Sequence, residues 1–140
     1  MADRHASLLV ADEIYFNLYG KAILQGIYHH DLGITGEQST APQLVFFFIA
    51  ETDVSDPFKS FAVEVTLPGN GPIRNDIPLI PAEIIAAANP GKTRLIYRQP
   101  LLVPAPVLRP GRIMAKVIHE RGDMIVTAPW IVQNLPQKAN

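Results

Sequence analysis

The sequence predicts an all-β protein, an antiparallel β-sandwich of about seven or eight short strands with Greek-key connections. Short apolar runs rich in aromatic and β-branched residues alternate with Gly and Pro turn signals along most of the chain. Only residues 81–88, PAEIIAAA, favour a helix, with Pro81 at the first turn and a stop at Asn89-Pro90-Gly91. Strands do not alternate with long helices, which disfavours a doubly wound α/β fold. A small closed β-barrel is the alternative, and residues 1–140 are expected to form one domain.

The first two strands are predicted at residues 7–15 and 21–28, joined by the turn Asn17-Leu18-Tyr19-Gly20. Gly26 lies inside the second run and indicates a bulge or a close backbone approach. The polar stretch 29–43 then reads as a loop long enough to cross from one sheet to another.

Residues 44–50, LVFFFIA, form the most hydrophobic run and predict a central strand that is buried on both faces. Residues 60–67 alternate apolar and polar side chains, which is typical of a strand with one buried face. The segment 73–79 is ambiguous, and residues 94–99 resume the alternation.

The closing third, residues 101–132, reads as a strand, a Pro-Gly turn, a second strand, a tight turn and a third strand. A two-residue loop at Gly122 and Asp123 would pair His119 with Val126, Val117 with Ala128, and Ala115 with Trp130. A three-residue loop would shift this pairing by one position and exchange the faces of one strand. We expect Trp130, the only tryptophan, to belong to the core.

The opposite face of this hairpin is the predicted interface between copies of the chain. It combines Lys116 and Glu120 with an apolar set that we expect to be covered by a partner: Met114, Ile118, Ile125 and Ile131. The sequence therefore predicts self-association as a homo-oligomer.

Composition limits the function further. The chain has 12 basic and 13 acidic residues and a net charge of -1, without the clustered Lys and Arg that phosphate contacts need. It contains no cysteine, which excludes thiol catalysis and thiolate metal sites. The apolar run near the N-terminus is too short for a signal-peptide core or a membrane span. We expect a soluble, cytoplasmic protein that binds neither nucleic acid nor membrane.

The candidate metal ligands are His29, His30 and Asp31, with His119 as a further ligand from the closing hairpin. Imidazole and carboxylate groups bind zinc and non-haem iron, although adjacent residues on a strand point to opposite faces. This set would serve a small metal-dependent enzyme or a ligand-binding sandwich. A third possibility is calcium-dependent membrane binding through loop carboxylates at Asp53, Asp56 and Asp76.

Catalytic signatures are weak. The serines lie in no Gly-x-Ser-x-Gly context, and Gly69-Asn70-Gly71 is followed by neither a Lys-Ser/Thr pair nor a helix. No cofactor is expected. The leading prediction is a non-catalytic interaction or structural module.

The opening segments Ala11-Asp12-Glu13, Gly20-Lys21 and Gly26-Ile27-Tyr28 resemble those of a family of short, uncharacterised bacterial and phage-associated proteins. Residues 63–69, VEVTLPG, and the Pro110-Gly111 and Gly122-Asp123 turns are similar to the layout of that family. The resemblance implies a compact β-sandwich, assigns no activity, and suggests a phage-derived accessory role.

Overall fold

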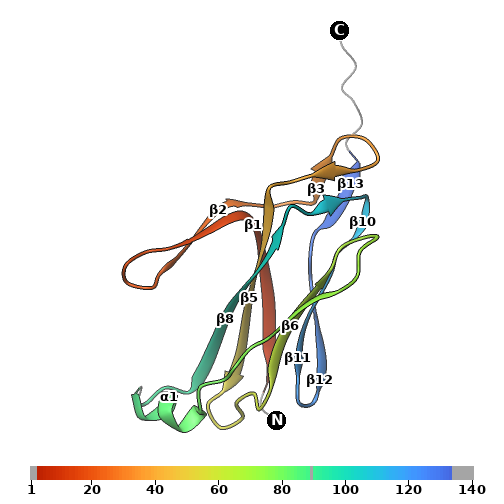
Figure 1. Ribbon diagram of the computed structural model, residues 1–140. Helices are drawn as coiled ribbons and strands as arrows, with labels where there is room; N and C mark the ends of the chain where they lie inside the picture. The colour runs from red at the N-terminus through yellow and green to blue at the C-terminus, as the bar shows by residue number, and fades with distance from the viewer. Residues whose placement is uncertain (1–2, 89, 134–140) are drawn as a thin grey trace.

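Two β-sheets face each other across a common apolar core (Figure 1). The structure, a computed structural model, describes residues 3–88 and 90–133. The first sheet contains, in spatial order, β2 (Ala22–Ile27), β1 (His5–Phe16), β5 (Gln43–Asp53) and β8 (Arg94–Pro104). The second contains β12 (Gly122–Val126), β11 (Met114–His119), β6 (Phe61–Thr66) and β7 (Ile73–Asp76). All neighbours in both sheets are antiparallel, as predicted.

Two small sheets cover the end of the sandwich where β3 and β13 lie (Figure 1). The first joins β10 (Gly111–Arg112), β13 (Trp130–Gln133) and β3 (Leu32–Ile34), and the second joins β4 (Ser39–Thr40) and β9 (Val107–Leu108). Each sheet of the described residues has two free edges, so the sandwich prediction is confirmed and the closed barrel is wrong. The single predicted helix is α1 (Ala82–Ala88). No described helix has the length and apolar character needed to cross a membrane.

Strand β5 is the centre of the first sheet, between β1 and β8. Leu44, Phe46 and Phe48 point into the core, where they meet Val63 and Val117 of the second sheet, and all five are fully buried. Val45 and Phe47 point to the other face and are 0% and 7% exposed. The prediction of a central strand buried on both faces is therefore confirmed.

The closing hairpin has a different register from the one predicted. His119 pairs with Gly122 and Ala115 pairs with Val126, so the tip consists of Glu120 and Arg121. The predicted pairing was wrong by four positions. Because four is an even number, Ala115 and Val126 still face the core as expected.

The third predicted strand of the closing segment is broken at residues 127–129. Pro129 cannot donate a ladder hydrogen bond, and the chain passes from β12 in the second sheet to β13 in a small sheet. Ile131 takes the inward position on β13 and is 1% exposed, whereas Trp130 is 51% exposed. The predictions of a buried Trp130 and an exposed Ile131 are both wrong.

Candidate interaction surfaces

The residues predicted to bind a metal do not come together. His29 and His30 are exposed in the bend between β2 and β3, while His119 ends β11 at the opposite end of the sandwich (Figure 1). Asp31 Oδ1 accepts a hydrogen bond from the Trp130 backbone N–H at 2.9 Å. Within residues 3–88 and 90–133, no group of three or more His, Asp or Glu residues could hold a metal ion.

The loop aspartates that suggested calcium are each paired with arginine instead. Asp53 pairs with Arg94, Asp76 with Arg74, and Asp56 with both Arg4 and Arg121. These carboxylates therefore neutralise neighbouring cations of the same chain.

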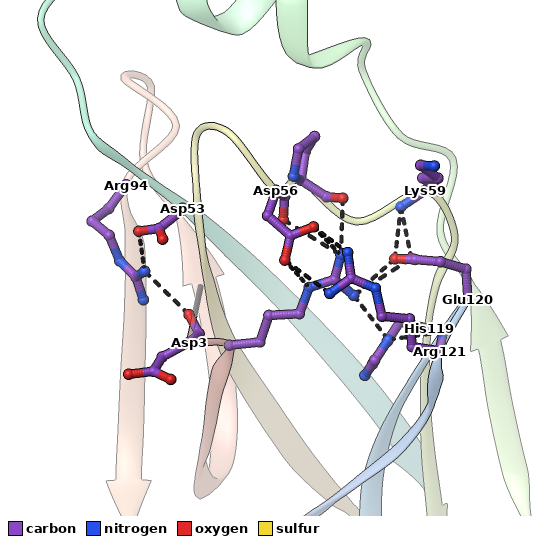
Figure 2. A network of polar contacts seen from close by, with 10 residues as sticks. Asp3, Asp53, Asp56, Lys59, Arg94, His119, Glu120 and Arg121 are labelled. Atoms are coloured by element: carbon purple, nitrogen blue, oxygen red, sulfur yellow. Dashed lines mark hydrogen bonds and ion pairs between the residues drawn. The ribbon is translucent and has the colours of Figure 1, made fainter. Parts of the chain in front are cut away.

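Arg4 contacts Asp56, His119 and Glu120 at one end of the sandwich, and we call this group, with Arg121, the Arg4 cluster. Figure 2 shows Asp56, His119, Glu120 and Arg121 close together there. The Arg4 side chain is only 7% exposed, and its Nη1 lies 2.8 Å from Glu120 Oε1 on the closing hairpin. Its Nη2 donates to the Pro57 carbonyl at 3.1 Å, in the loop between β5 and β6. The guanidinium also lies over the Phe58 ring, 4.8 Å from the centroid. One side chain at the start of the chain thus ties both sheets together.

His119 takes part in this cluster as a hydrogen-bond acceptor. Arg4 Nη1 lies 2.9 Å from its Nδ1, and the Arg121 backbone N–H donates to the same nitrogen at 3.2 Å. Since arginine has no acceptor, Nδ1 carries no proton here. Burial, followed by the positive charge of Arg4, lowers the pKa of His119.

The carboxylates of the cluster are held in their charged form. For Glu120, burial opposes ionisation, but the Lys59 backbone N–H and Arg4 outweigh it and lower the pKa. The hydrogen bond from Arg121 is the main cause of the lowered pKa of Asp56. Because the carboxylates of Asp56 and Glu120 are paired with arginine and stay ionised, a structural role is favoured over acid-base chemistry.

A hairpin arm, residues 13–25, projects sideways from the first sheet (Figure 1). It leaves the sheet where Gly26, at φ +72°, opposes Asp12 so closely that a Cβ on Gly26 would collide with the Asp12 carboxylate. Tyr28 donates its hydroxyl to Asp12 Oδ1 at 2.7 Å, and burial together with this bond raises the pKa of Tyr28 to about 12. The pairing of β1 with β2 keeps one register on both sides of Gly26, so Gly26 marks a close approach to Asp12 and not a bulge.

The tip of the arm is a turn closed by Asn17. Its side-chain oxygen accepts from the Tyr19 and Lys21 backbone N–H groups at 2.9 and 3.0 Å. Gly20 adopts φ +74° in the position predicted from the sequence. The turn leaves Leu18 and Tyr19 100% and 87% exposed.

Besides the arm, the outer face of the first sheet is also an apolar surface. Cross-strand register places Leu9, Phe47 and Pro100 in one row and Ala11, Val45 and Leu102 in the next, all pointing away from the core. Leu9 and Leu102 remain 39% and 46% exposed. A groove of about 610 Å³ lies between this face and the arm, lined by Phe16, Gly20, Lys21, Ala22, Leu24, Phe47, Arg98 and Pro100.

The interface predicted on the closing hairpin is interrupted by charge. Met114 and Ile125 are 39% and 62% exposed, and Ile118 is half-buried. Lys116 lies among them and pairs with Glu64 and Asp123 at 3.3 and 3.1 Å. The arm and the outer face together expose more large apolar residues than the closing hairpin does. This surface was not predicted from the sequence, although two large apolar residues, Leu18 and Tyr19, in the turn at 17–20 indicated it.

Neither a family model, nor a curated protein, nor a solved structure matches this chain.

Proposed function

We propose that this chain is a non-catalytic β-sandwich module that associates with further copies of itself. The observation that carries the proposal is the hairpin arm, whose large apolar side chains are at least half exposed in the described part of the chain. Tyr15, Phe16, Leu18, Tyr19 and Ile23 are between 50% and 100% exposed. Contiguous apolar surface of this kind is typical of a protein contact.

The exposed aromatic rings of the arm supply about half of the area that a stable interface buries on one partner. The exposed fractions of Tyr15, Phe16 and Tyr19 amount to about two whole rings, or about 400 Å² at about 200 Å² per ring. The aliphatic residues of the arm and the outer face add to this. A standard interface buries about 800 Å² on each partner, so a contact that used both surfaces would approach that size.

The polar groups support an assembly role more than a catalytic one. The strongest polar cluster joins Arg4, Asp56 and Glu120 in mutual ion pairs at one end of the sandwich. The arm lies away from this cluster. The groove beside the arm is lined by apolar residues apart from Lys21 and Arg98. The resemblance to phage-associated proteins is in keeping with this proposal, of which a phage-derived accessory role is one version.

Light scattering behind size-exclusion chromatography tests the proposal. We expect the wild-type chain to run as a dimer or larger assembly, insensitive to a chelator. Leu18→Asp should shift it toward the monomer because the fully exposed tip would then carry a charge into the contact. Ile125→Asp, on the closing hairpin, is the matched control and should leave the mass unchanged. A wild-type monomer at every accessible concentration would contradict the proposal.

A further inference from the structure

We infer that the tip of the hairpin arm docks in the groove on the outer face of a second copy, so that each copy gives one tip and receives one. This inference rests on the proposed self-association and names the two surfaces that meet. The tip is defined by Leu18 and Tyr19. The groove is the one beneath the arm, over Phe47, Arg98 and Pro100.

The groove has the size and lining of a binding site. Its volume of about 610 Å³ falls within the range of about 300–1,000 Å³ that is typical of sites enclosing a ligand. Phe16 and Leu24 of the arm form one wall, and Phe47 and Pro100 of the sheet form the other. Side chains that fill it should be apolar or aromatic, as those of the tip are.

Arg98 adds a specific preference for an aromatic ring. Its side chain lines the groove and, among the described residues, has no ion pair or hydrogen bond. A guanidinium without a carboxylate partner binds well over the face of a tyrosine ring. Tyr19 supplies such a ring, 87% exposed.

The arm cannot fill the groove of its own chain with these residues. Gly20, Lys21 and Ala22 already line the groove, whereas Leu18 and Tyr19 do not. Figure 1 shows the tip extending past β8, away from the sheet. A second copy would account for both the exposed tip and the open groove. The groove of the second copy would cover the tip of the first, and the tip of the second copy would fill the groove of the first.

Backbone pairing between sheet edges is a weaker alternative. β8 is an edge strand of the first sheet, paired only with β5 in the described structure, but Pro100 and Pro104 remove two N–H groups four residues apart. Prolines are tolerated in edge strands with the nitrogen facing outward, where they block strand addition. At the β8 edge, beside the groove, contact through side chains is therefore favoured over continuation of the sheet.

Disulfide trapping between singly substituted chains tests the inference, since the protein contains no cysteine of its own. An affinity-tagged Leu18→Cys chain is mixed with untagged Arg98→Cys and oxidised mildly, and the disulfide-linked pair of tagged and untagged chains is quantified. The control partner is Ile125→Cys, which is exposed but far from the groove in sequence and fold. Light scattering on each single variant reports whether it still assembles.

We expect several-fold more linked pair with Arg98→Cys than with Ile125→Cys. A folded Arg98→Cys chain that no longer assembles, beside an Ile125→Cys chain that does, would also support the inference. Equal trapping by both partners, or no trapping by an Arg98→Cys chain that still assembles, would overturn the docking and leave self-association standing. A monomeric wild-type chain would instead remove the proposed function itself.

Discussion

Replacing Arg4 by alanine should lower the free energy of unfolding by about 2–3 kcal/mol. Hydrogen bonds that involve a charged group contribute about 1.5–3 kcal/mol each. Arg4 makes such contacts with Glu120 and with the Pro57 carbonyl, and its side chain is 7% exposed. Glu120 keeps the bond from the Lys59 backbone N–H in the variant, so the loss stays below the sum of the two contacts.

The assay is urea unfolding at pH 7, followed by far-ultraviolet circular dichroism at one fixed protein concentration, because the proposed assembly would make stability depend on concentration. Arg74→Ala is the matched control. Its ion pair with Asp76 has side chains 47% and 78% exposed, and exposed pairs contribute less than about 1 kcal/mol. Arg4→Met should fall between the two, because it retains apolar packing against Phe58 and loses the charge. If Arg4→Ala unfolded at the same urea concentration as Arg74→Ala, the cluster would not be joining the two sheets.

Three further results are expected. Burial, and then Arg4, lower the pKa of His119 from 6.5, so the unfolded chain binds a proton at this residue more readily than the folded chain does. The free energy of unfolding should therefore fall as the pH drops below about 6.5. This pH dependence should be lost in His119→Gln and kept in the control His30→Gln. Gly26→Ala should destabilise the protein by more than Gly20→Ala in thermal unfolding, since both glycines have positive φ but only Gly26 would meet the Asp12 side chain. Trp130, 51% exposed, should be readily quenched by acrylamide in the native protein, and quenching only after unfolding would contradict its placement.

Local patterns were sufficient to predict the long strands and the helix, but β3 and β4 lie in the stretch 29–43 that was predicted as a loop. The run at 44–50 became the centre of β5, and the alternation at 60–67 became β6, because side-chain period and apolar content act within a few residues. The prediction of α1 likewise depended on Pro81 and the alanines beside it. The place of Gly26 inside a strand was sufficient to suggest a close approach there, although the alternative of a bulge was wrong.

The errors concern features set by residues distant in sequence. Trp130 was expected in the core because it is large and apolar, but its outward position depends on which sheet β13 joins after Pro129. The Arg4 cluster could not be predicted, since Arg4 and Glu120 are 116 residues apart in the chain. The arm was predicted as an ordinary hairpin, because nothing in its sequence shows that it leaves the sheet.

The way in which the arm is anchored would lower the cost of the proposed contact between copies. The bond between Tyr28 and Asp12 and the conformation of Gly26 fix its base, while Asn17 closes its tip, so little ordering remains to oppose binding. A tip that meets one groove gives each copy at most two neighbours through this contact, and such a contact closes into a dimer or ring only if the rotation between copies closes. An exposed strand edge would add copies without limit, and the prolines of β8 oppose that route. In the proposed assembly, each copy would therefore use one tip and one groove, and light scattering would show whether the resulting contacts close.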